Sequence, residues 1–313
     1  MVLEILISIK EGIKNPWNVF YLSSIVSIIS FVISFIIFKH DVGLYSVILT
    51  TLGLTPFMVK LSIYEAKKSI SKDNKSISDL LFFHVKNRKV IKKFLLLSSI
   101  PFVIASLFFK SFEIAILISM LYIGVFLLFS LVFFSYYKEI VMSFVAIFSG
   151  ITIVFSILYL LLPTEIAEKT FKTQINEIRA IRGHFWFGET FQKILINNIG
   201  VLFVSFLFSF IYGSGAIFVL AWNASILATA ASMLAKNLGG FYNLPLALLS
   251  YMPHGSLEIV AYFLAAIAGG IASYHITKGK VVKSLIEDCL FLLALGIVFL
   301  LLGAAIETAA LLS

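Results

Sequence analysis

The sequence predicts an all-α fold: a polytopic transmembrane helix bundle of about eight or nine spans. Apolar residues make up 60% of the 313 residues and charged residues only 13%. A soluble domain carries roughly 25% charged residues. The mean hydropathy is +1.05, and apolar runs near the ~20 residues that span a bilayer as a helix alternate with short polar breaks. These observations exclude a soluble globular protein and make the lipid bilayer the first expected partner.

Eight apolar runs predict single membrane-spanning helices. They cover residues 21–38, 42–59, 94–109, 114–137, 140–162, 199–221, 253–276 and 289–312. Residues 223–252 are predicted to add one broken crossing, because a Gly-Gly pair and a proline interrupt helices. Broken backbone at membrane depth must be buried in protein or line a wet cavity. The residues assigned to this broken-helix segment are Asn223, Gly239, Gly240 and Pro245.

The distribution of basic residues predicts the orientation. The loop 60–93 contains ten of the 24 Lys and Arg residues. Because loops rich in Lys and Arg stay in the cytoplasm, this loop and the N-terminus are expected on the cytoplasmic side of the cell membrane. The net charge of +8 therefore indicates a membrane orientation and not a nucleic-acid partner.

A second polar segment, residues 163–198, has nearly balanced charges. Its basic and acidic residues recur at helical spacing, which is typical of an amphipathic helix at a membrane interface. Counting spans from a cytoplasmic N-terminus places this segment on the outer side. We therefore predict an amphipathic interfacial segment there.

Alanine usage divides the chain near residue 139. Residues 1–138 contain three alanines and residues 199–313 contain 18. Small residues let membrane helices approach closely, so we predict an N-terminal four-helix module at 1–138, with its basic loop at 60–93, and a tighter domain at 139–313. The single cysteine, Cys289, excludes a disulfide within the chain and a metal site built from cysteines. A homo-oligomer is compatible with this pattern.

A few polar residues near or inside the C-terminal spans form a candidate cluster. Intramembrane ionisable residues are costly and usually functional. Glu258 follows His254 by four residues, which places both on one helix face, and an antiparallel pairing of the last two helices brings Glu307 to the same depth. The predicted partner or ligand site consists of Glu189, Asn197, Asn198, His254, Glu258 and Glu307. No catalytic residue, metal ligand set or cofactor is predicted, and Glu258 as a simple acid near a helix N-terminus is the alternative interpretation.

The C-terminal half resembles the stage II sporulation protein M family over roughly residues 140–313. The resemblance implies a polytopic membrane protein that anchors and recruits cell-wall hydrolases in spore-forming bacteria and is not itself a hydrolase. Residues 1–138 lie outside it. The residues that carry the resemblance are Phe191, Asn197, Asn198, Gly213, Gly215, Asn223, the Pro253-His254-Gly255 motif with Glu258, Gly269, and Ala304-Ala305-Ile306-Glu307.

Three functions follow from these patterns. The first is a non-enzymatic scaffold that recruits an extracytoplasmic protein partner, as the resemblance implies. The second is a transporter or channel that uses the broken helix and the intramembrane acids. The third is an intramembrane metalloenzyme in which His254, Glu258 and Glu307 hold the metal.

Overall fold

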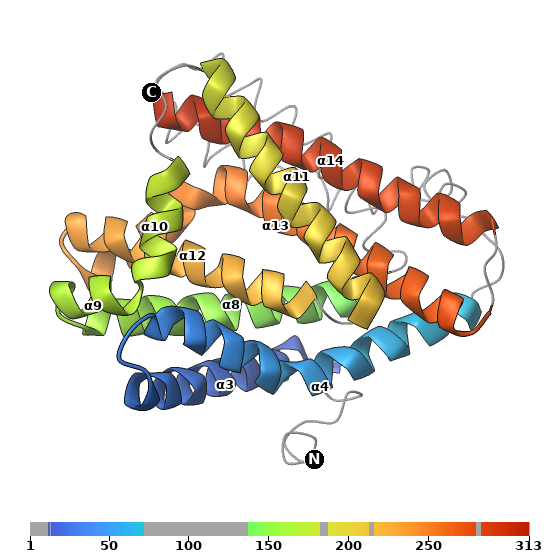
Figure 1. The fold of residues 1–313 in the computed structure, drawn as a ribbon, viewed down its shortest axis with the longest axis horizontal. Coiled ribbons are helices and arrows are strands. Elements are labelled where there is room, and N and C mark those ends of the chain that lie inside the picture. Colours follow the sequence, from blue (N-terminus) through green and yellow to red (C-terminus); the bar gives the residue numbers. More distant parts are fainter. Residues whose placement is uncertain are drawn as a thin grey trace. The chain divides into compact units, whose positions relative to one another are not determined.

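The computed structural model describes residues 12, 14–71, 137–181, 187–212, 216–279 and 283–312, and these residues are helical with short connections. The predicted all-α fold is confirmed. Two predicted spans, 94–109 and 114–137, lie outside the described residues, as do most of the basic loop and residues 213–215. Figure 1 shows the described helices. They are α3 (Pro16–Ile37), α4 (Val42–Ser71), α8 (Lys138–Leu161), α9 (Thr164–Thr170), α10 (Lys172–Ile181), α11 (Phe187–Tyr212), α12 (Ala216–Asn237), α13 (Leu244–Thr277) and α14 (Lys283–Leu312).

Seven of the described helices are long and apolar enough to cross a membrane: α3, α4, α8, α11, α12, α13 and α14. The chain is therefore a multi-pass membrane protein. The described helices form two compact units. The first contains α3, α4 up to Ile63, α8, α9, α10, α12 and the start of α13 up to Tyr251. The second contains α11, α13 from Met252 onward, and α14.

The predicted broken crossing at residues 223–252 is wrong. α12 is continuous to Asn237, and the interruption is a turn between two helices, with a short 3-10 helix at Phe241–Asn243. Gly239 and Gly240 have φ angles of 112° and 109°, a conformation that favours glycine. Pro245 lies in the first turn of α13, where a missing N–H costs no helical hydrogen bond. Gly239, Gly240 and Pro245, which were predicted to break a helix inside the membrane, instead end one helix and start the next.

The predicted span 199–221 is displaced for a related reason. α11 begins at Phe187, twelve residues before the predicted start, and ends at Tyr212. Its first turns contain polar residues, which a search for apolar runs leaves out.

Asn223 lies inside α12, where its Nδ2 donates to the carbonyl oxygen of Val219 at 2.8 Å, so it neither caps a helix nor interrupts one. Residues 187–312 still hold four candidate spans, the number predicted.

In the first unit, small residues bring α3 and α8 together. A Cβ at Gly150 would lie 2.9 Å from the carbonyl oxygen of Phe20, and Ser23 Oγ donates to the carbonyl oxygen of Ala146 at 3.5 Å. Close packing and interhelical hydrogen bonds associate helices in lipid, where the hydrophobic effect between helices is absent. Hydroxyls act in the same way between α8 and α12, since Ser232 Oγ donates to the carbonyl oxygen of Ser156 at 3.2 Å.

The segment after α8 is anchored in the first unit by one face of α10. Phe171, Gln174, Ile175 and Ile178 are buried, at the three- and four-residue spacing of a helix face. Gln174 Nε2 donates to Ser225 Oγ on α12 at 3.4 Å. The charged residues of α10 point away from this face and are exposed. The predicted amphipathic segment thus exists, but it ends at residue 181, because Phe187–Asn198 belongs to α11.

In the second unit, α13 and α14 pack as antiparallel neighbours along a seven-residue repeat of small residues. Cys289 Sγ donates to the carbonyl oxygen of Ala268 at 3.5 Å. Seven residues further along α14, a Cβ at Gly296 would lie 3.5 Å from the carbonyl oxygen of Ala261. A seven-residue repeat keeps one face of a helix toward its partner. Seven residues after Gly296, Gly303 faces His254, Leu257 and Glu258 of α13.

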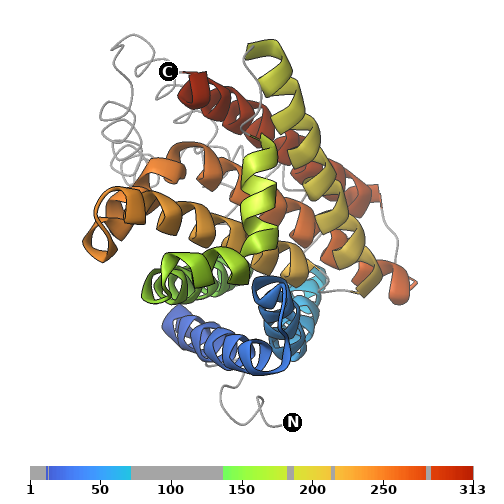
Figure 2. The ribbon, with the colours of Figure 1, turned by 60° about the vertical axis from the view of Figure 1, so that its left-hand side comes forward.

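α11 covers this pair with a narrow stripe and leaves most of its surface exposed. It packs along α14, as Figure 1 and Figure 2 show. The buried residues repeat every three or four positions: Thr190, Ile194, Asn198, Leu202, Ser205 and Ser209. The stripe therefore brings Asn198 toward the two helices that carry the acids.

Candidate functional site

The centre of the site is a group of polar side chains from three helices, which we call the carboxyl–amide cluster: Asn198 of α11, Glu258 and Tyr262 of α13, and Glu307 of α14. Asn198 Nδ2 donates to Glu258 Oε1 at 2.6 Å. Tyr262 Oη donates to Asn198 Oδ1 at 2.9 Å. Glu307 lies one helical turn beyond Gly303, the residue of α14 that faces Glu258. The Asn198 amide therefore uses both its ends inside the cluster.

The cluster depends on the packing of α13 against α14. A Cβ at Gly303 would lie only 3.3 Å from Glu258 Cγ, a contact tighter than a side chain accepts easily. Glu307 follows Gly303 by one helical turn, so it lies on the same face of α14. The glycine thus leaves the space that the Glu258 side chain occupies.

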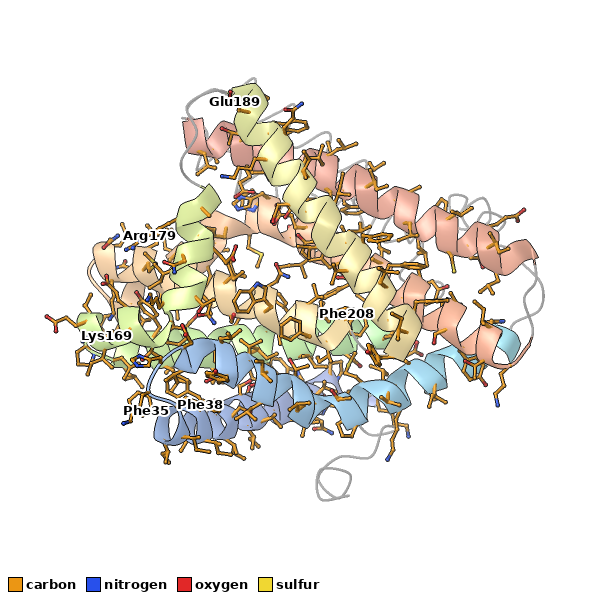
Figure 3. All side chains as sticks on the ribbon, viewed as in Figure 1. Phe35, Phe38, Lys169, Arg179, Glu189 and Phe208 are labelled. Carbon is orange, nitrogen blue, oxygen red and sulfur yellow. The ribbon has the colours of Figure 1, made fainter. Side chains whose placement is uncertain are left out.

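The remaining predicted site residues, Glu189, Asn197 and His254, lie outside the cluster and are more exposed than Asn198. Asn198 is buried and Glu258, Glu307 and His254 are half-buried, whereas Glu189 and Asn197 are exposed. Asn197 Nδ2 donates to Asn198 Oδ1 at 3.4 Å. His254 lies one turn before Glu258 on α13. Figure 3 shows Glu189 at the beginning of α11, where a helix macrodipole favours a negative charge.

Tyr262 is the residue that sequence reasoning missed. It is buried, and it follows Glu258 by four residues and His254 by eight, so all three share one face of α13. That spacing was available in the sequence. A tyrosine in an apolar run, however, does not by itself indicate that its hydroxyl has a polar partner.

The cluster differs from a metal centre. Within the described ranges, no three His, Cys, Asp or Glu side chains lie close enough to hold a metal ion. His254, Glu258 and Glu307, the set considered from the sequence, do not form such a group. What the side chains form instead is a chain of hydrogen bonds from Tyr262 through the Asn198 amide to Glu258.

These features define a class: a multi-pass helical membrane protein with a hydrogen-bonded polar cluster in its C-terminal helices. Residues 164–310 match the family model described as Stage II sporulation protein M, SpoIIM. The C-terminal half of the chain is therefore a SpoIIM family domain. The match begins at α9 and contains all six predicted site residues. A search of curated proteins and a search of solved structures each gave no match.

The cluster makes a testable contribution to stability. Replacing Asn198 by Ala removes its hydrogen bonds to Glu258, Tyr262 and Asn197, and replacing Tyr262 by Phe removes one of them. In membranes such bonds contribute about 0.6 kcal/mol on average and up to about 1.7 kcal/mol. We expect the Asn198→Ala substitution to cost about 1–2 kcal/mol of unfolding free energy and Tyr262→Phe less.

A double-mutant cycle measures this coupling by denaturant unfolding of the purified protein in detergent. If Asn198 holds Tyr262, the double variant loses less than the sum of the single variants. Strict additivity would contradict the hydrogen-bond chain. Asn197→Ala is the matched control: it removes only the long, part-buried 3.4 Å bond to Asn198 and should stay within about 0.5 kcal/mol of the parent.

Proposed function

We propose that this protein is a non-enzymatic membrane scaffold that recruits an extracytoplasmic protein partner. The SpoIIM family domain supports this role, since the family resemblance implies an anchor for other proteins. Asn198 of the carboxyl–amide cluster bonds to Glu258 and Tyr262 across two helices, and such an arrangement suits a structural connection between helices. The recruiting surface must then lie elsewhere on the chain.

The observation that carries the proposal is the anchored, charged segment α9–α10. Phe171 and Gln174 are fully buried and fix the segment to the first unit, while its charged side chains are exposed. Figure 3 shows Lys169 extending from the end of α9. Because the backbone of α9–α10 is fixed and its exposed side chains carry charges of both signs, the segment favours specific electrostatic pairing with a protein surface. These side chains are Glu165, Glu168, Lys169, Lys172, Glu177 and Arg179.

The orientation belongs to the same proposal. The basic loop 60–93 places the N-terminus in the cytoplasm by the positive-inside rule, and α9–α10 then lies outside. Labelling of a cysteine at position 169 tests this orientation. With Cys289 replaced by Ala, a membrane-impermeant maleimide should label Lys169→Cys in intact cells and Lys278→Cys only after permeabilisation. The reverse pattern would contradict the orientation.

Affinity purification from native membranes tests recruitment. The tagged parent should recover a specific extracytoplasmic protein in a reproducible ratio, and the double variant Lys172→Glu/Arg179→Glu should lose most of it. The matched control is Lys138→Glu/Lys278→Glu, the same charge change at exposed residues on the predicted cytoplasmic side, which should leave recovery unchanged. Recovery of a monodisperse protein with no partner would contradict the scaffold.

Two alternatives lose their support. The transporter hypothesis used a broken crossing and the intramembrane acids, and the interruption at residues 238–243 is a turn between α12 and α13. The metalloenzyme hypothesis needs a metal-binding group, and among the described side chains no three His, Cys, Asp or Glu residues form one.

A further inference from the structure

The turn between α12 and α13, together with the first turns of α13, forms an uncharged surface of the first unit. From Asn237 to Pro253 the sequence contains no Asp, Glu, Lys, Arg or His. Tyr242, at the centre of the turn, is 95% exposed. An exposed apolar patch marks contact with a partner or with lipid. The exposed large side chains, which we call the apolar turn surface, are Leu238, Phe241, Tyr242, Leu246 and Leu249.

The backbone of this turn pairs its polar groups within the chain. Gly240 N–H donates to the carbonyl oxygen of Ala235 at 2.7 Å, and Asn243 N–H donates to that of Gly240 at 3.0 Å. Asn243 Nδ2 donates to the carbonyl oxygen of Leu238 at 2.7 Å. Where water is scarce, unpaired backbone groups are costly, so a turn there must satisfy them itself. The turn therefore meets the requirement for a place at the apolar side of the membrane interface.

The last charged side chain before this surface, that of Lys236, is held by α8. Its Nζ donates to the carbonyl oxygen of Leu162 at 2.9 Å and lies 4.9 Å from the centroid of the Tyr159 ring. Because α9 begins at Thr164, this contact places the turn on the same side of the first unit as α9. That side thus has two surfaces of different chemistry, the charged segment α9–α10 and the uncharged turn.

The start of α13 is not needed for a membrane crossing. The candidate span Phe241–Thr277 has 37 residues, whereas about 20 residues cross the hydrocarbon core. Residues up to Tyr251 belong to the first unit, in which α12 already supplies a candidate span of 22 residues. Residues 241–251 are therefore available for another position, and exposure of their apolar side chains to water would be unfavourable.

We propose that the apolar turn surface is a lipid anchor, seated between the headgroups and the acyl chains of the leaflet next to α9–α10. Aromatic side chains such as Phe241 and Tyr242 are enriched at that level of a membrane, and buried apolar area drives insertion there. Since the surface has no charge, insertion requires no anionic lipid. The anchor sets the depth at which α9–α10 leaves the membrane, and it depends neither on a recruited partner nor on the orientation of the chain.

Spin labelling of the full chain in phosphatidylcholine vesicles tests the anchor. With Cys289 replaced by Ala, a nitroxide is attached at Tyr242→Cys or, as a second position, at Leu246→Cys. Both labels should collide more often with oxygen, which concentrates in lipid, than with a water-soluble nickel complex. The matched control is Lys169→Cys, at an exposed residue of α9 on the same side of the unit, where collisions with the nickel complex should prevail.

Two results would overturn the anchor. A preference for the nickel complex at positions 242 and 246 would place the surface in water, where a soluble protein could dock. Few collisions with either reagent would place it against protein, such as a second copy of the chain. The oxygen preference should also be equal in vesicles with and without an anionic lipid, and a preference seen only with anionic lipid would contradict insertion by apolar contacts.

Discussion

Replacing Phe171 by Ala should destabilise the first unit by about 3–5 kcal/mol, the range for removing a buried phenylalanine. Phe171 is fully buried. Its ring centroid lies 6.1 Å from that of Phe31 on α3, 6.2 Å from that of Phe155 and 5.3 Å from that of Tyr159 on α8. Alanine leaves a cavity where the short connection before α10 meets two long helices. Unfolding of the purified protein by a denaturing detergent, followed by circular dichroism, measures the loss.

The control for this substitution is Phe35→Ala. Phe35 is 47% exposed on α3, on a surface available to lipid. When a lipid-facing ring is removed, lipid chains fill its space, so no cavity remains. The substitution of Phe35 should cost less than about 1 kcal/mol. Equal losses from Phe35→Ala and Phe171→Ala would show that Phe171 is not an anchor. Because α9–α10 carries the proposed docking surface, Phe171→Ala should also lower recovery of the partner.

Replacing Gly269 by Ala should separate α11 from α13 and cost about 3 kcal/mol, at the upper end for an added methyl group in a packed interface. A Cβ at this position would lie 2.9 Å from the backbone nitrogen of Phe210 and 2.9 Å from Ser209 Cβ, and it would also meet the carbonyl oxygen of Phe206. Backbone atoms cannot turn aside as the end of a flexible side chain can. The helices must therefore move apart.

The same chain offers two matched controls. At Gly255 on α13 and Gly200 on α11, an added methyl group would have no neighbouring atom within 4 Å. At both, alanine should be neutral or stabilise the helix by up to about 1 kcal/mol, since alanine has the higher helix propensity. A Gly269→Ala variant as stable as Gly255→Ala would contradict the close approach of α11 and α13.

The sequence was sufficient for the fold class and for most span positions. The predicted span 140–162 corresponds to α8 at Lys138–Leu161, because a helix that crosses apolar lipid needs that length of apolar residues. The pairing of α13 with α14 was also predictable, since a connection of a few residues between long helices makes them antiparallel neighbours. The boundary near residue 139 and the roles of the polar residues stay predictions.

The errors came from residues whose meaning depends on position within an element. A glycine pair and a proline interrupt a helix wherever they occur, but the sequence did not indicate whether the interruption lay inside a crossing or between two. The structure places Gly239 and Gly240 in a turn with positive φ and Pro245 in the first turn of the following helix. The polar first turns of α11 were likewise assigned to the preceding segment, because an apolar run begins later than the helix that contains it.

By itself, the sequence determined that this protein is a multi-pass helical membrane protein and which few polar residues accompany its C-terminal spans. Hydrophobicity and helix length suffice for that, since both are local properties. Only the tertiary structure decided that Asn198, Tyr262 and Glu258 form one hydrogen-bonded group. The partners come from different helices, and the space for Glu258 beside α14 depends on the missing side chain of Gly303, a steric fact that no local pattern contains.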